Sequence, residues 1–309
     1  TQAKRIASLL GNRAAGSFSE ARMHVPVDVA NAARERARAL ECDCCVSIGG
    51  GSTTGLGKAL ALDPGIPLIA IPTTYAGSEM TNIWGITDGD RKRTGRDLKV
   101  LPSLTIYDAE LTLDLPLSMT GVSAMNALAQ ATVNAYDPRP SPLVRTMALE
   151  AINTLSKALP DVMSQPHDID AREQLLYGAS LAAAALGTGV TSLHHKLCHT
   201  LGGTFNTPHA ETHTIMLPYT TAYNAPAVPQ LMAPVATALG SDSAAAGIFD
   251  LTSGLGLPTS LHHIGIGTGD LERVASIVLE QPPQNPAAVT KTAIMALLEQ
   301  ALAGTRPAG

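Results

Sequence analysis

The sequence of 309 residues has few aromatic residues, few charged residues and no excess of basic charge. Phe, Trp and Tyr together make up 3% of the chain and charged residues 15%, whereas Ala and Gly are abundant. This composition argues against an all-β sandwich rich in Tyr and Trp, and favours closely packed helices joined to strands by tight turns. The formal net charge of −5 argues against a broad surface for nucleic acid or membrane, so neither is expected as a partner.

Cysteine is scarce as well, with only Cys42, Cys44, Cys45 and Cys198. Cys42 and Cys45 form a CxxC pair, but no second pair completes a zinc site. The pair leads into a predicted strand and not onto a helix N-terminus, which would activate a redox thiol. We therefore expect reduced thiols in a cytoplasmic enzyme. The opening TQAKRIASLLGNRAAG has no apolar core of the kind found in a signal peptide. The uncharged stretch Leu175–Leu193 is long enough to span a bilayer, but Gly, Ser and Thr make it less apolar, so no membrane span is expected there.

The apolar pattern predicts alternating strands and helices in the first third of the chain and helices alone after Ser118. Short apolar runs predict buried strands at 44–48, 67–71 and 104–107, and helical spacing predicts helices at 1–10, 27–40 and 53–62. Strands that alternate with helices in this way indicate a doubly wound parallel sheet. The later Ala- and Leu-rich runs, such as 124–136, 142–159, 171–186, 193–201 and 287–303, predict an all-helical region.

We therefore divide the chain into a dinucleotide-binding α/β domain, residues 1–116, and a helical substrate domain, residues 117–309. The cleft between two such domains is the default site for a ligand. A dinucleotide-binding sheet normally opens with a strand, whereas this chain opens with a helical pattern. The first strand and its loop are accordingly expected to be missing.

Two polar turns follow neighbouring predicted strands. Gly49, Gly50, Gly51 and Ser52 form the first, and the second contains Thr73, Thr74 and Ser78. Successive glycines let the backbone approach a pyrophosphate closely, and free N–H groups at the following helix favour an anion. Ser52 is expected to cap that helix or to donate to a phosphate oxygen. An ordinary strand-to-helix turn and simple helix capping are the alternative interpretations.

A basic segment, DRKRTGRDLK, contains Arg91, Lys92, Arg93, Arg96 and Lys99. Arginine suits bidentate contacts with carboxylates, so the segment could recognise a carboxylate-rich substrate. A solvated hairpin or loop is the favoured interpretation of any single residue here.

Histidines are concentrated between residues 194 and 213, where His194, His195, His199, His209 and His213 lie. His195 and His199 are four residues apart and share one helix face, and the loop at 202–207 can turn the chain back. The cluster suits either a metal site or general acid–base chemistry, with core packing of one or two rings as the third possibility. We assign packing to His194 and rank His213 as a weaker candidate.

Six segments together resemble the maleylacetate reductases of the iron-containing alcohol dehydrogenase superfamily, which is close in fold to dehydroquinate synthase. They are GGGSTTGLGKA (49–59), IPTTYAGSEMT (71–81), RKRTGRD (91–97), MNALAQA (125–131), LHHKLCHTLGG (193–203) and PHAETHT (208–214). The resemblance implies a Rossmann-like domain, a helical domain, a homodimer, and NADH or NADPH as hydride donor, without deciding between the two. The implied reaction reduces maleylacetate, a small dicarboxylate keto substrate, to 3-oxoadipate in the bacterial degradation of aromatic compounds.

The resemblance also bears on metal binding. Iron-dependent relatives hold their metal with an Asp-x-x-x-His pair on one helix and two histidines fourteen residues apart. The matching positions here are Asn126, Gln130, His195 and His209. Two neutral amides should weaken metal binding severely, so no catalytic metal is expected. Maleylacetate reductases share the Asn but usually keep the second histidine, so Gln130 departs from their pattern.

The roles implied are those of a metal-free reductase. His195, His199 and His209 line the cleft and one of them supplies a proton, Asn126 orients the substrate, and Lys196 stabilises an enolate or binds a carboxylate. Two alternatives stay open: a metal-dependent alcohol or polyol dehydrogenase of the same superfamily, and a catalytically impaired nucleotide-binding fragment.

Overall fold

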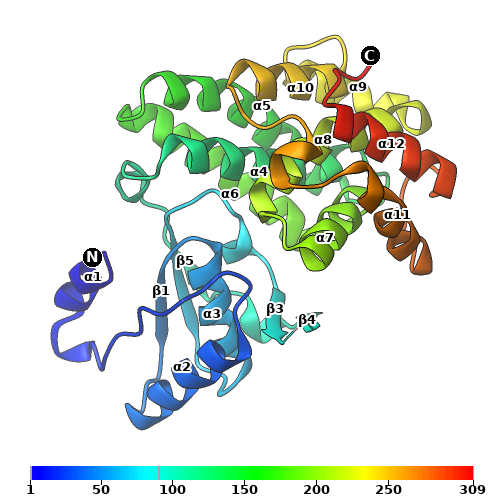
Figure 1. Ribbon diagram of the computed structural model, residues 1–309. Helices are drawn as coiled ribbons and strands as arrows, with labels where there is room; N and C mark the ends of the chain where they lie inside the picture. The colour runs from blue at the N-terminus through cyan, green and yellow to red at the C-terminus, as the bar shows by residue number, and fades with distance from the viewer. Residues whose placement is uncertain (1, 90, 309) are drawn as a thin grey trace. The chain divides into compact units, whose positions relative to one another are not determined.

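The computed structural model describes residues 2–89 and 91–308, and the chain divides into two compact units, residues 1–114 and 115–309 (Figure 1). The first unit contains a parallel sheet, and the described part of the second contains only helices and turns. An α/β sheet followed by a helical region is the fold class that the sequence predicts, and this prediction is confirmed.

The sheet of the first unit has three parallel strands in the order β1-β2-β5. These are β1 (Cys45–Gly49), β2 (Leu68–Pro72) and the short β5 (Leu104–Thr105), and α3 (Gly51–Leu62) connects the first two. Cys45 lies opposite Leu68 in the register. A Cβ at Gly57 would lie 2.6 Å from the Leu68 side chain, so α3 packs on the sheet at a distance that only glycine allows.

A second helix and a hairpin complete this unit. The helix α2 (Val27–Ala39) packs its apolar face on α3, where Val29, Ala33 and Leu56 belong to one buried cluster. The strands β3 (Ile83–Asp88) and β4 (Arg91–Arg96) form an antiparallel hairpin. The basic segment therefore lies largely in a strand, with the Arg93 and Arg96 side chains exposed. The remaining helix, α1 (Gln2–Leu10), opens the described chain.

The second unit is built around α4 (Leu117–Tyr136), which is buried from Thr120 to Tyr136. Its many alanines, such as Ala127 and Ala131 at 0% exposure, let the helices that contact it, α5, α6, α8 and α9, approach closely. The helices after α4 are α5 (Pro142–Ser164), α6 (Ile169–Thr188), α7 (Leu193–Phe205), α8 (His209–Asn224), α9 (Pro229–Ala238), α10 (Ala244–Gly254), α11 (Leu271–Glu280) and α12 (Lys291–Ala303).

A buried apolar cluster joins α7 and α8 to α11 and α12, with Leu197, Ile215, Val274 and Leu298 among its members. Packing on this cluster fixes the two helices that carry the histidines. Within the described residues, no single helix is both long and apolar enough to cross a membrane. The pair α6 and α7 meets that criterion only jointly, with a bend of 96° between them.

The loop that leads into α7 is tied to α4 by Asn134. The side-chain amide of Asn134 donates to the carbonyl of Gln130 at 2.9 Å and to that of Val190 at 3.3 Å, and it accepts from the Val190 N–H at 2.8 Å. At the next residue, the Thr191 carbonyl accepts from Arg139 Nη2 at 3.2 Å. These bonds set where α7 begins.

Replacing Gly189 with alanine should break this connection. The new Cβ would lie 2.0 Å from Asn134 Oδ1 and 2.4 Å from the Ala185 carbonyl, so the buried amide must move away from its partners. We expect Gly189→Ala to lower the free energy of unfolding by about 1–3 kcal/mol in urea titrations. A control, Gly203→Ala in α7, has no neighbouring atom within 4 Å of its new Cβ. It should be as stable as wild type or more so. Equal stability of Gly189→Ala and wild type would contradict this account.

Candidate active site

Two glycines of the turn after β1, Gly49 and Gly50, leave little room for a side chain. Gly49 has φ +149°, in the region that favours glycine, and a Cβ on Gly50 would lie 3.0 Å from the Thr74 side chain. The Thr73 N–H donates to the Gly49 carbonyl at 3.0 Å. The two polar turns predicted from the sequence therefore lie side by side at the carboxyl ends of β1 and β2, which is the edge where open α/β sheets bind ligands.

The expected capping role of Ser52 is wrong. The helix α3 begins at Gly51, two residues earlier than predicted, and Gly50 is its N-cap. Ser52 thus lies inside the first helical turn, where its own N–H has no partner from the preceding turn of helix. Gly50 can take the cap position because a residue without Cβ fits against Thr74.

A buried polar network follows the second turn, and the sequence interpretation missed it. The Lys58 ammonium donates to the carbonyls of Thr81 and Ile83, each at 2.8 Å, and to Thr81 Oγ1 at 2.9 Å. Glu79 is buried and accepts from the Tyr107 hydroxyl at 3.0 Å. Burial lowers the pKa of Lys58 to about 7, and the Glu79 carboxyl opposes that shift. The one cation within the apolar run LGKALAL was the available signal.

The helices α7 and α8 gather all five clustered histidines. Asn206 ends α7 in the left-handed conformation, and Pro208 precedes α8, so the chain reverses within three residues. The helix α7 carries His194, His195 and His199, and α8 carries His209 and His213. The ring centroids are separated by 6.2 Å for His195–His199, 6.1 Å for His199–His209, 4.4 Å for His209–His213, 5.4 Å for His195–His213 and 4.8 Å for His194–His213.

The cluster runs from the interior to the surface of the helical unit. His199 and His209 are exposed, His195 is 5% exposed, and His194 and His213 are fully buried. His194, to which we assigned only packing, is hydrogen-bonded to His213 and so belongs to the same cluster. The predicted residues His195, His199 and His209 are brought together, and the structure adds two more rings.

The two amide positions lie on one face of α4. Asn126 and Gln130 are 3% and 4% exposed and lie one helical turn apart. The Thr214 hydroxyl donates to the Val122 carbonyl at 3.5 Å, so α4 and α8 are in contact here. On α4, Val122 lies one helical turn before Asn126, and on α8, Thr214 is the residue after His213. Lys196 is half-buried on α7. The catalytic roles of Asn126 and Lys196 stay predictions.

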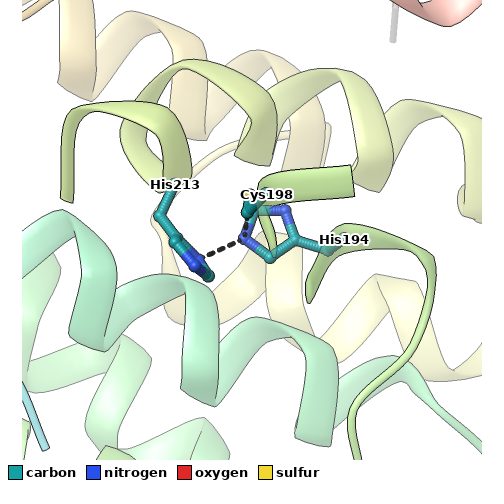
Figure 2. Close-up of side chains that lie close together, drawn as sticks. All are labelled: His194, Cys198 and His213. Atoms are coloured by element: carbon teal, nitrogen blue, oxygen red, sulfur yellow. Dashed lines mark hydrogen bonds between the residues drawn. The ribbon is translucent and has the colours of Figure 1, made fainter. Parts of the chain in front are cut away.

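Figure 2 shows the two innermost imidazoles, His194 and His213, beside Cys198, and both rings are buried. Burial lowers the pKa of His194 to about 3 and holds the pKa of His213 well below its ordinary value. Burial also raises the pKa of the Cys198 thiol, whose sulfur lies 3.8 Å from His194 Nε2. Donor atoms of these three residues lie within 4.8 Å of one another, but a 2.9 Å hydrogen bond already joins His194 Nε2 to His213 Nδ1. A cation there would have to displace that bond and a thiol proton.

A parallel sheet with a glycine turn, followed by helices that carry clustered histidines, defines a nucleotide-dependent oxidoreductase class. The chain belongs to the iron-containing alcohol dehydrogenase family. Residues 2–109 match the family description "Iron-containing alcohol dehydrogenase", and residues 120–302 match "Fe-containing alcohol dehydrogenase family, C-terminal".

Within that family the chain is similar to maleylacetate reductases. It is 50% identical to the enzyme of Burkholderia cepacia and 47% identical to that of Sphingobium indicum, in each case over 99% of this chain and 87% of the relative. The solved maleylacetate reductase of Rhizobium sp. strain MTP-10005 superposes with a TM-score of 0.95 at 49% identity, over 99% of this chain and 87% of that one. The resemblance inferred from the motifs is confirmed.

Acid should destabilise the protein through its buried imidazoles. The pKa of His194 is about 3 in the folded chain and near 6.5 when unfolded, so the unfolded state binds more protons between these values. Stability is therefore lost as the pH falls below the unfolded pKa. His194 alone should remove about 2 kcal/mol between about pH 7.5 and about pH 5, measured by urea unfolding.

The control variants separate this effect from general acid sensitivity. His194→Gln should show a smaller loss over the same interval, whereas His263→Asn, which changes an exposed histidine, should match wild type. The same loss in wild type and His194→Gln would refute the assignment.

Proposed function

We propose that this chain reduces maleylacetate to 3-oxoadipate with hydride from NADH or NADPH, without a catalytic metal. The observation that carries the proposal is the imidazole cluster of α7 and α8, combined with buried amides at Asn126 and Gln130. The identity to several maleylacetate reductases over 99% of the chain supports the choice of substrate. We also propose that the enzyme is a cytoplasmic homodimer that requires neither nucleic acid nor membrane.

The first unit fits a dinucleotide. The backbone of Gly49–Ser52 and the first N–H groups of α3 would hold the pyrophosphate, because the three glycines at 49–51 have no side chain to block its approach. The hydroxyls of Thr73, Thr74 and Ser78 would donate to the cofactor from the adjacent turn. When bound, the reduced nicotinamide supplies the hydride.

The residues do not fit a catalytic iron. The four positions that match the iron ligands are two amides and two imidazoles, and none carries a negative charge. A divalent ion beside the buried Asn126, Gln130 and His195 would be desolvated without a compensating carboxylate, which is strongly unfavourable. The proposed reaction therefore uses no metal.

The chemistry of an enone needs donors and a proton source. Hydride adds to the carbon β to the ketone of maleylacetate, and negative charge develops on the enolate oxygen. The buried His195 ring and the Asn126 amide would donate to that oxygen. His209, which is exposed at the first residue of α8, then transfers a proton to the carbon next to the ketone. His199 stacks on His209 and restores its proton from solvent, and Lys196 binds a substrate carboxylate.

The reaction itself is tested by following the absorbance of reduced cofactor. We expect oxidation of NADH or NADPH that depends on maleylacetate, with 3-oxoadipate as the product identified by mass spectrometry. Simple primary alcohols should not support reduction of NAD or NADP. A chain that binds cofactor but leaves maleylacetate unchanged would rule out the proposed reaction.

Two substitutions test the assignment of the histidines. His195→Ala and His209→Ala should each lower kcat by about 100-fold or more, because each removes a group that contacts the reacting atoms. His263→Ala changes an exposed histidine outside the cluster and should keep the wild-type kcat. Near-normal kcat in both site variants would show that the site is misassigned.

A further inference from the structure

We propose that His213 is a positioning residue: Thr220 and His194 fix its tautomer, so that its Nε2 presents a bare lone pair to His209. This inference rests on the proposed function, because that proposal makes His209 the acid. It gives a role to His194, His213 and Thr220, which take no direct part in the proposed reaction.

The three residues form one continuous hydrogen-bonded chain. His194 Nδ1 lies 3.0 Å from Thr220 Oγ1. His194 Nε2 lies 2.9 Å from His213 Nδ1 (Figure 2). All three side chains are at most 1% exposed. The second nitrogen of His213, Nε2, is buried and has no hydrogen-bond partner among the described residues. The chain therefore has one closed end, at Thr220, and one open end, at His213 Nε2.

The closed end sets the direction of every hydrogen bond. Thr220 Oγ1 lies 3.0 Å from the Met216 carbonyl and 3.1 Å from the Leu217 carbonyl, both of which only accept. If the hydroxyl donates to either carbonyl, it accepts from His194 Nδ1–H. The neutral His194 ring then accepts at Nε2 from His213 Nδ1–H. A neutral His213 with its proton on Nδ1 has a bare Nε2.

The opposite direction is less favourable. It would require the Thr220 hydroxyl to donate to His194 Nδ1, His194 Nε2–H to donate to His213, and His213 Nε2 to carry a proton. That N–H would be buried without an acceptor. Orphaned buried donors are rarer and more costly than acceptors that lack a partner. The first direction satisfies every donor, so we assign it.

The chain positions a ring and does not conduct protons. It ends at a hydroxyl that is 0% exposed, so no proton can leave through Thr220. Its effect is to give His213 one fixed tautomer. The nearest ring on the open side is His209, at 4.4 Å between centroids, compared with 5.4 Å for His195 and 6.4 Å for His199. His213 Nε2, which has no hydrogen-bond partner among the described residues, can then accept from a ring N–H of His209 and so orient that ring.

The tautomer can be measured without substrate. Proton–nitrogen correlation spectra of the full chain, labelled with ¹⁵N-histidine, distinguish bare from protonated ring nitrogens. We expect His213 to carry its proton on Nδ1 and to have a bare Nε2, with His194 in the same form. A protonated Nε2 on neutral His213 would overturn the inference.

A matched pair of substitutions tests the positioning role. His213→Asn keeps a donor near Nδ1 for His194 but has no acceptor at the Nε2 position, whereas His213→Gln reaches that position with a carbonyl oxygen. We expect His213→Asn to lower kcat by about tenfold or more with little change in KM, and His213→Gln to recover part of the loss. Equal losses in both variants, tracking a common loss of stability, would indicate a merely structural residue.

The closed end provides an independent check. Thr220→Val keeps the shape of the side chain but removes the hydroxyl, and should lower kcat in the same way as His213→Asn. Thr220→Ser should restore it. A Thr220→Val variant with wild-type kcat and a wild-type tautomer of His213 would contradict the proposed chain of hydrogen bonds.

Failure of this inference can be told apart from failure of the proposed function. A bare Nε2 in a chain that does not reduce maleylacetate supports the tautomer and counts against the reaction. A protonated His213 Nε2 in a protein that does reduce maleylacetate supports the reaction and counts against the tautomer.

Discussion

The hydrogen bond between His194 and His213 joins α7 to α8 in a dry interior, and the arrangement of the site depends on it. Burial holds both rings neutral, as the lowered pKa values of both residues indicate. Because the inner pair is neutral and fixed, the proposed reaction assigns proton transfer to the exposed residues His199 and His209. Packing of α7 and α8 on α11 and α12 holds this geometry rigid.

The sheet unit also contains a buried polar network. The buried Lys58 ammonium donates hydrogen bonds to Thr81, and the buried Glu79 carboxylate accepts one from Tyr107. These bonds fix the chain just after the Thr73–Ser78 turn. A fully satisfied buried network makes a segment rigid, whereas a half-satisfied one destabilises it. Both units therefore place their more accessible functional groups beside buried polar residues.

Much of the sheet and three of the five clustered histidines could be predicted from the sequence. β1, β2 and α3 follow from apolar runs broken by glycine, and the four-residue spacing of His195 and His199 puts them on one helix face. The hairpin of β3 and β4 was harder, because its alternation is half-buried and interrupted by polar residues. Its second strand falls in the basic segment, for which a solvated hairpin or loop was the favoured interpretation, and the structure has the hairpin.

The remaining site residues escaped prediction for physical reasons. Helical spacing correctly puts His194 on a different face of α7 from His195, but it cannot show that this face meets α8. The acceptor at Thr220 lies 26 residues away from His194 in sequence. Ser52 was misplaced because the cap went to Gly50, a choice that depends on the nearby Thr74 side chain and not on local sequence.

The central claim is that neutral amides and imidazoles carry out the reduction where related enzymes use iron. The most direct test measures metal content and maleylacetate turnover on the same purified sample. The account predicts full turnover with far less than one equivalent of any transition metal, and no gain when Fe²⁺ or Zn²⁺ is added. Turnover that rises in proportion to bound metal would contradict it.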